Sequence, residues 1–216
     1  MTTPSDPTKP LPHKPYVIGV TGYPGAGKDT FAAQLKEAVE TSGRSAQLVS
    51  SGDLIRQYVR DNKLGDYGDR ELLQKIASKV MAERGPEIWL EQAIAAAQDC
   101  DVLLYPGLRH PDELAEIHQN QGIVVVIDVP IEVRYQRSQR RKRHGDEMSF
   151  EEFKVDDAGE RAGKGQQVEA VVAQADVIVQ NDGDLAQLKR VAETIIASLP
   201  DQIKPRYDAS TMEAQS

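Results

Sequence analysis

Gly22-Tyr23-Pro24-Gly25-Ala26-Gly27-Lys28-Asp29-Thr30 is the stretch that decides the fold of this 216-residue chain. It follows the apolar run Tyr16–Val20 and precedes Phe31-Ala32-Ala33-Gln34-Leu35, so a buried strand is predicted to turn into a helix there. The unpaired N–H groups at the start of a helix, together with its dipole, attract anions. Three glycines in the loop allow its amides to curl inward. The stretch therefore predicts a phosphate-binding loop that holds a nucleoside triphosphate.

Two positions in the loop carry the expected chemistry, and one departs from the general pattern. Lys28 supplies a mobile positive charge that can follow the β- and γ-phosphates. Asp29 stands where a Ser or Thr usually follows the lysine, and the hydroxyl comes one residue later, as Thr30. We expect Gly22, Gly25, Ala26, Gly27, Lys28, Asp29 and Thr30 to bind ATP, with Thr30 offering its hydroxyl to Mg²⁺.

Composition limits the function classes that need to be considered. The net charge is −8 and the pI is near 5.1, which argues against a general affinity for nucleic acid. The single cysteine, Cys100, excludes an internal disulfide framework and fits a reducing cytoplasm. No apolar run approaches the ~20 residues of a membrane span. We therefore expect a cytoplasmic protein that binds neither nucleic acid nor membrane; the sequence leaves its oligomeric state open.

Short Val- and Ile-rich runs alternate with longer segments of helical periodicity. Continuous apolar runs without two-residue alternation are typical of strands buried on both faces. The expected strands are Tyr16–Val20, Ala46–Val49, Val102–Tyr105, Ile123–Asp128 and Asp176–Val179. The expected helices are Lys28–Ser42, Gly52–Asn62, Arg70–Glu83, Pro86–Asp99, Pro111–Gln119, Ile131–Arg143 and Asp184–Ser198. The pattern predicts an α/β protein with a three-layer α/β/α architecture and a five-stranded parallel sheet.

One domain accounts for residues 16–199, between an N-terminal arm (1–15) and a C-terminal tail (200–216) that are both expected to be disordered. In a parallel sheet, ligands bind at the carboxyl ends of the strands. Segments with arginines follow three of these ends: 50–56 after the second strand, 106–110 after the third, and the helix that follows the fourth. So many arginines near a phosphate loop, in an acidic protein, indicate a second anionic ligand.

Together these segments resemble the nucleoside-monophosphate kinases, and the adenylate kinase group in particular. The loop 22–30 is similar to the adenylate kinase loop, which also has Pro at its third position and Thr two places after the Lys. The segment 51–56 resembles the one whose hydroxyl and arginine hold the acceptor monophosphate. Gly107-Leu108-Arg109 resembles the segment with the second acceptor-binding arginine. The resemblance implies that Ser51, Asp53, Arg56 and Arg109 bind the acceptor.

The C-terminal half resembles the dephospho-coenzyme A kinases and a group of their uncharacterised relatives. Residues 137–141 and 175–183 are similar to the lid helix and final strand of that family, which implies a small lid over about 137–165. Phe153 and the pair Asp157 and Glu160 match positions in the uncharacterised relatives. Two departures stand out: Pro106 replaces the Asp that organises the magnesium waters in adenylate kinases, and Asp156 replaces an expected Arg.

These residues predict phosphoryl transfer, which depends on positioning and charge neutralisation rather than covalent chemistry by the protein. Lys28, Arg109, Arg137 and Arg141 are the expected catalytic residues, with the last two closing over the donor from one helix. Arg56 and Arg109 are expected to clamp the acceptor phosphate. We expect a P-loop kinase acting on a small phosphate-bearing acceptor, such as a nucleoside or deoxynucleoside monophosphate. Two alternatives stay open: dephospho-coenzyme A kinase, for which Asp53 is the candidate carboxylate, and a nucleotide-binding regulator without catalysis.

Overall fold

A five-stranded, all-parallel sheet forms the centre of the protein in a computed structural model that describes residues 14–141, 148–161 and 167–200. The strand order is β2-β3-β1-β4-β5. The strands are β1 (Tyr16–Thr21), β2 (Ala46–Leu48), β3 (Val102–Pro106), β4 (Ile123–Asp128) and β5 (Val177–Gln180). The prediction of a five-stranded parallel sheet is confirmed, and each predicted strand agrees with the observed one to within one residue at either end.

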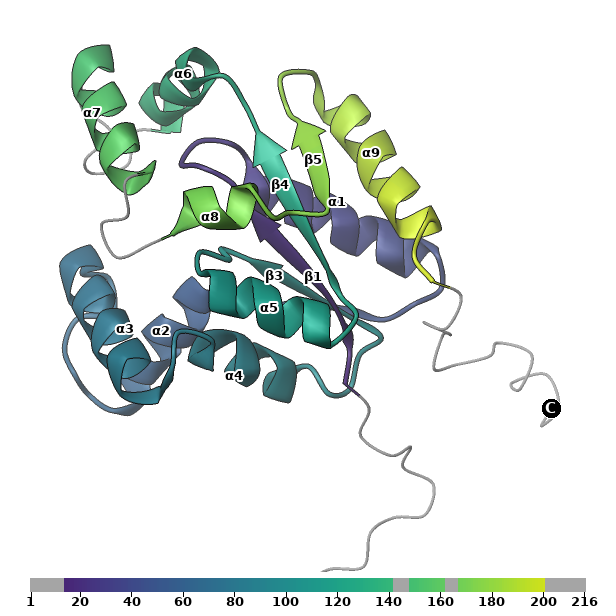
Figure 1. The fold of residues 1–216 in the computed structure, drawn as a ribbon, viewed down its shortest axis with the longest axis horizontal. Helices are drawn as coiled ribbons and strands as arrows, with labels where there is room; N and C mark the ends of the chain where they lie inside the picture. Colours follow the sequence, from purple (N-terminus) through teal and green to yellow (C-terminus); the bar gives the residue numbers. More distant parts are fainter. Residues whose placement is uncertain (1–13, 142–147, 162–166, 201–216) are drawn as a thin grey trace, which may run out of the picture.

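Helices connect the strands and cover both faces of the sheet (Figure 1). They are α1 (Lys28–Thr41), α2 (Ser51–Asp61), α3 (Arg70–Arg84), α4 (Ile88–Ala96), α5 (Pro111–Gln119), α6 (Ile131–Arg141), α7 (Phe150–Arg161), α8 (Val168–Val172) and α9 (Leu185–Ala197). The helices α7 and α8 were not among those that the sequence predicted. The expected arm and tail fall almost wholly outside the described residues, as do 142–147 and 162–166 of the expected lid.

The core has two halves because alternate residues of the buried strands point to opposite faces of the sheet. Ile18 and Val20 of β1 face α1 and α9 and are fully buried there. Val17, between them, faces the other half, which is built from α4, α5 and residues of α8. Helices on both faces of a parallel sheet make the expected three-layer α/β/α architecture.

The carboxyl edge of the sheet is where the loops that follow β1 and β3 meet. The two strands are neighbours with Val20 opposite Pro106, and the Gly107 N–H donates to the Val20 carbonyl. The buried Thr21 hydroxyl donates to the Leu108 carbonyl over 2.7 Å. These bonds fix the segment 107–110 beside the start of the glycine-rich loop. At this end of the sheet α2 and α3 flank β3, whereas α6 and α7 lie on the β4 side (Figure 1).

None of the helices in the described ranges combines the length and the apolar character that a membrane span requires.

Candidate functional site

The loop between β1 and α1 has the backbone shape that an anion site requires. Gly27 caps α1 in a left-handed conformation with φ of 94°, and Gly25 has φ of 81°. A Cβ at Gly27 would lie 2.6 Å from Asn181 Nδ2, and one at Gly25 would lie 2.8 Å from the Arg134 carbonyl oxygen. Glycine is therefore required at both positions by conformation and by space. The N-terminus of α1, where backbone N–H groups point along the helix axis and favour an anion, therefore begins at this loop.

Lys28, Asp29 and Thr30 are the first three residues of α1. Asp29 and Thr30 are exposed, and Ala26 is buried beneath the loop. Thr30 presents a hard oxygen donor beside the phosphate loop, which suits Mg²⁺, an ion that is usually held by a few protein oxygens, waters and substrate phosphates. No group of three or more His, Cys, Asp or Glu side chains that could bind a metal occurs in the part of the chain that the structure describes. Thr30 is the residue of the loop that could hold a magnesium ion carried by a nucleotide.

The carbonyl of Ala26, in the middle of the loop, is held by two side chains from the β4–β5 side. Asn181 Nδ2 donates to it over 2.8 Å, and Arg137 Nη1 donates over 3.3 Å. Arg137 Nη2 also donates to the Asn181 carbonyl over 2.8 Å. Arg137, which was expected to close over the donor, is thus bound to the loop and to the end of β5. Arg141 ends α6, and its side chain lies outside the described part of the structure.

A buried ion pair supports the first half of the loop. Arg134 is 1% exposed and Asp157 is 5% exposed, and their side chains form a bidentate salt bridge between α6 and α7. Arg134 also donates to the Val129 carbonyl and, at 3.5 Å, to the Pro24 carbonyl in the loop. Its guanidinium lies 5.2 Å from the ring centroid of Tyr23. The pair therefore joins the phosphate loop to α7, a connection that sequence reasoning missed.

A small cavity lies between the loop and β5. Its volume is about 220 Å³, and its lining residues are Gly27, Thr30, Arg137, Asn181, Gly183, Asp184, Leu185 and Leu188. One end is therefore formed by the phosphate loop and the other by the turn after β5. The arrangement can receive the nucleoside end of a nucleotide whose phosphates lie in the loop.

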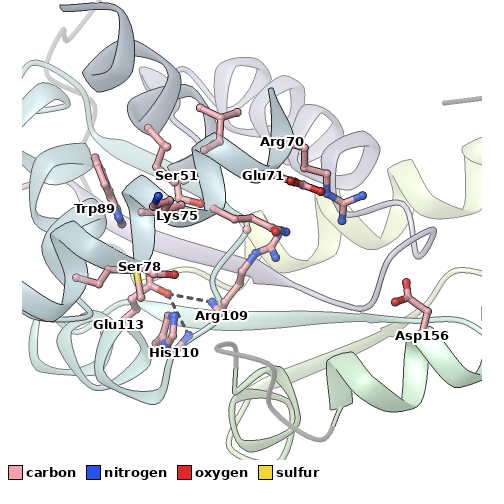
Figure 2. Close-up of a pocket in the computed structure, with 17 residues that line it drawn as sticks. Ser51, Arg70, Glu71, Lys75, Ser78, Trp89, Arg109, His110, Glu113 and Asp156 are labelled. Carbon is pink, nitrogen blue, oxygen red and sulfur yellow. Dashed lines mark hydrogen bonds between the residues drawn. The ribbon is translucent and has the colours of Figure 1, made fainter. Parts of the chain in front are cut away.

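A larger cavity lies on the other side, over β3, α2 and α3 (Figure 2). Its volume is about 730 Å³, which is within the range of small-molecule sites. Its polar lining residues are Ser51, Arg70, Glu71, Gln74, Lys75, Ser78, Arg109, His110, Glu113 and Asp156; Gly52, Ile55, Leu73, Ala77, Met81, Trp89 and Gly107 complete the lining. Three cations, from α3 and from the loop after β3, thus face the same space, where they can bind an anion.

The floor of this cavity is a buried hydrogen-bonded network centred on Glu113 of α5. Glu113 is 3% exposed and accepts bonds from the Tyr105 hydroxyl at 2.8 Å and from the N–H groups of Arg109 and His110 at 2.9 and 3.1 Å. Ser51 forms a side-chain hydrogen bond with Tyr105. Glu113 therefore shapes the backbone that carries Arg109.

Burial controls the protonation of this network. It raises the pKa of Glu113 above its usual value, although the hydrogen bonds from Arg109, Tyr105 and His110 oppose the shift. Burial and then the Glu113 carboxylate raise the pKa of Tyr105 well above 10.0. Burial also lowers the pKa of His110. Tyr105 thus stays protonated as a donor to Glu113 near neutral pH.

The structure separates the residues that were expected to bind the acceptor. Ser51 and Arg109 line the larger cavity, whereas Asp53 and Arg56 do not. Those two form an exposed ion pair with each other over 2.8 Å, and Asp53 also accepts from Ser50 at the start of α2. Pro106 is the buried last residue of β3 and pairs with Val20.

Sequence reasoning missed several lining residues, chiefly Arg70, Lys75, Trp89, Glu113 and Asp156. The lining residues of α3 recur at positions 70, 74, 78 and 81, with others beside them, so they share one face of that helix. That spacing was visible in the sequence. Nothing in the sequence, however, places the face against the loop after β3.

Comparison with known proteins places the chain in a family and identifies its fold. A UPF0200 protein of Thermococcus kodakarensis is 27% identical over 196 residues, which cover 85% of this chain and all of that one. A UPF0200 protein of Saccharolobus islandicus is 28% identical over 83% of this chain and 91% of its own. Among solved structures, TT1252 from Thermus thermophilus has a TM-score of 0.54 at 19% identity and covers 87% of this chain and all of that one. Shikimate kinase from Bacteroides thetaiotaomicron has a TM-score of 0.52 at 16% identity over 83% of this chain and 95% of that one.

These likenesses identify the P-loop kinase fold. They do not assign the chain to the adenylate kinases or to the dephospho-coenzyme A kinases. The family model described as "AAA domain" matches residues 18–159, a range that runs from β1 through the phosphate loop into α7. The chain therefore belongs to the AAA domain family.

Proposed function

We propose that the protein is an ATP-dependent kinase that transfers the γ-phosphoryl group to a small phosphate-bearing acceptor, such as a nucleoside or deoxynucleoside monophosphate. One observation carries the proposal: the phosphate loop follows the central strand and lies between two cavities. The cavity of about 220 Å³ is on the β4–β5 side, and the cavity of about 730 Å³ is on the β3–β2 side. A protein that only bound or hydrolysed a nucleotide would need one of them. The family and the P-loop kinase fold support nucleotide-dependent phosphoryl transfer.

The donor would lie with its nucleoside end in the smaller cavity and its phosphates in the loop. The amides at the start of α1 and the Lys28 ammonium would bind the β- and γ-phosphates, which are the groups whose charge changes during transfer. The hydroxyl of Thr30 would help to hold Mg²⁺, which when bound neutralises charge on the donor phosphates. Arg137 and Asn181 keep the Ala26 carbonyl turned toward them, so the loop is shaped before the nucleotide arrives.

The acceptor would lie in the larger cavity with its anionic group against Arg109. The planar guanidinium can bind two phosphate oxygens at once, and Arg70 and Lys75 supply further positive charge in the same cavity. An oxygen of the acceptor phosphate would then attack the γ-phosphorus, the bond from that phosphorus to the β–γ bridging oxygen would break, and ADP would leave. Such an oxygen is already ionised near neutral pH, so no general base is required.

A phosphate-bearing acceptor agrees with the geometry better than a hydroxyl acceptor does. Dephospho-coenzyme A would need a carboxylate beside its ribose hydroxyl, and Asp53 was the candidate. Asp53 is paired with Arg56 and does not line the cavity. Glu113 does line it, but its carboxylate accepts three hydrogen bonds from its own surroundings.

A coupled assay of ADP release tests the proposal. ATP and Mg²⁺ are supplied with a panel of nucleoside and deoxynucleoside monophosphates and with dephospho-coenzyme A. We expect turnover with at least one monophosphate, and Lys75→Ala should raise the KM of that acceptor. Lys79→Ala is the matched control: it lies on the same helix, pairs with Glu83 and does not line the cavity. Turnover with dephospho-coenzyme A alone would replace the proposal, and tight ATP binding without turnover on any acceptor would favour a regulator.

A further inference from the structure

Trp89 lines the larger cavity and carries a buried hydrogen-bond donor without a partner within the described ranges. The residue is 2% exposed, and its indole Nε1 has no hydrogen-bond partner among the described residues. Trp89 nevertheless lines the cavity, and its ring packs edge-on against Tyr58 with 5.8 Å between ring centroids. Buried indole N–H groups normally find an acceptor. An indole N–H that lacks an acceptor in a residue lining a cavity therefore points to a ligand atom as its acceptor.

The surroundings of Trp89 differ from those of the arginines. Trp89 belongs to a buried apolar cluster with Val80 and Ile88, and Ile55 and Met81 pack against that cluster and also line the cavity. Figure 2 shows Trp89 and Asp156 at opposite ends of the labelled residues, with Ser51, Lys75 and Arg109 between them. The cavity thus has an apolar wall at Trp89, while Arg70 and Arg109 lie nearer to Asp156.

A ligand that matches this gradient has an anionic group at one end and a flat, weakly polar group at the other. A sugar hydroxyl would leave the apolar walls facing a polar surface. An aromatic heterocycle would cover them and still offer an oxygen or nitrogen in the plane of its ring. The cavity volume of about 730 Å³ is large enough for a nucleotide rather than for a phosphate ion alone.

We infer that the indole N–H of Trp89 donates to a carbonyl oxygen or ring nitrogen on the base of the acceptor, and so selects a nucleotide over a simpler phosphorylated sugar. This inference rests on the proposed function, because it assumes that the larger cavity is the acceptor site. Trp89 is then a specificity-determining residue at the end of the acceptor remote from the transferred phosphoryl group. It adds a contact to the base beyond the phosphate clamp.

The chain has one tryptophan, so its fluorescence reports on this cavity alone. The wild-type protein is titrated with nucleoside monophosphates, with ribose 5-phosphate and with inorganic phosphate, without ATP. We expect a saturable change in Trp89 emission with at least one nucleoside monophosphate and none with the two phosphates that lack a base. An unchanged emission while equilibrium dialysis detects a bound nucleoside monophosphate would overturn the inference.

Trp89→Phe provides the second readout, because phenylalanine keeps an aromatic ring against Tyr58 but has no N–H. Loss of one hydrogen bond should raise the acceptor KM ~3- to 10-fold and leave kcat and the KM for ATP unchanged. Tyr58→Phe is the control for local packing, since it preserves the ring contact and its hydroxyl does not line the cavity. Circular dichroism and thermal unfolding verify that both variants fold; if Trp89→Phe does not, the emission titration of the wild type decides.

The two proposals fail in different ways. Turnover of a nucleoside monophosphate with the same KM in Trp89→Phe and in the wild type would overturn the role of Trp89 and leave the kinase intact. A saturable emission change with a nucleoside monophosphate, without turnover on any acceptor, would support the role of Trp89 and remove the kinase activity. Neither binding nor turnover with any member of the panel would overturn both.

Discussion

The buried pair between Arg134 and Asp157 gives a prediction whose size follows from its environment. Replacing Asp157 by alanine leaves the Arg134 guanidinium almost fully buried without a carboxylate partner among the described residues, while the carbonyls of Val129 and Pro24 still accept its hydrogen bonds. Removing one partner of a buried pair costs about 3–5 kcal/mol. That is a large part of the ~5–15 kcal/mol that stabilises a typical domain.

Urea unfolding followed by circular dichroism measures this cost. With an m value of about 2 kcal/mol/M, the unfolding midpoint of Asp157→Ala should fall by roughly 2 M. Lys36→Ala is the surface control, since Lys36 forms an exposed pair with Glu40 one turn along α1 and should lose no more than about 1 kcal/mol.

The double variant Arg134→Met, Asp157→Leu separates the buried charge from the lost packing. Because it removes both charges, it should be more stable than Asp157→Ala alone. If Asp157→Ala lowers the free energy of unfolding no more than Lys36→Ala does, the Arg134–Asp157 pair does not support the loop and this reasoning is wrong. The same conclusion follows if the double variant is the less stable of the two.

Three further predictions concern the loop and the floor of the larger cavity. Lys28→Ala should keep the melting temperature and abolish ADP release, and residual turnover near the wild-type rate would contradict the role of Lys28. Gly27→Ala introduces a Cβ at φ of 94° and 2.6 Å from Asn181 Nδ2, so ATP affinity measured by calorimetry should drop at least ~10-fold; an unchanged affinity would show that the loop relaxes freely. Burial raises the folded-state pKa of Glu113 above 4.5, so its contribution to stability is greatest at acid pH and declines as pH rises through the folded-state pKa. The difference in unfolding free energy between wild type and Glu113→Gln should therefore fall from about pH 4.5 upward, and a difference that grows with pH would reverse the assignment.

The sheet could be predicted from the sequence because its signals are local. Val- and Ile-rich runs that are buried on both faces leave few alternatives to parallel strands, and the glycine-rich loop fixes which strand turns into α1. The helices α7 and α8 were missed for equally local reasons. Helix α8 has five residues, too few for periodicity, and the described part of α7 buries mainly Phe153 and Asp157.

The place of the glycine-rich loop between β1 and α1 could be predicted, but the cavity wall opposite Arg109 could not. Arg56 was expected to be the partner of Arg109 because the segment 51–56 resembles the acceptor-binding segment of the adenylate kinases. The side chain instead pairs with Asp53 one turn earlier on α2 and does not line the cavity. The cations that do line it, Arg70 and Lys75, come from α3, and their position depends on how α2 and α3 pack together. That packing has no signature in the order of the residues.

The way in which α6 is attached has a consequence for how substrates enter. Two of its arginines are bonded to carbonyls of the phosphate loop, and one of these is also locked to α7. Moving α6 away from the loop would expose the buried charge of Arg134, so we expect α6 to stay in place on the nucleotide side of the loop. Helices α2 and α3 each have a single buried residue, Val59 and Val80 respectively. Segments with so little burial open at low cost. We therefore expect α2 and α3 to move more readily than α6. Hydrogen exchange in α2 and α3 should slow when the acceptor binds rather than when ATP does.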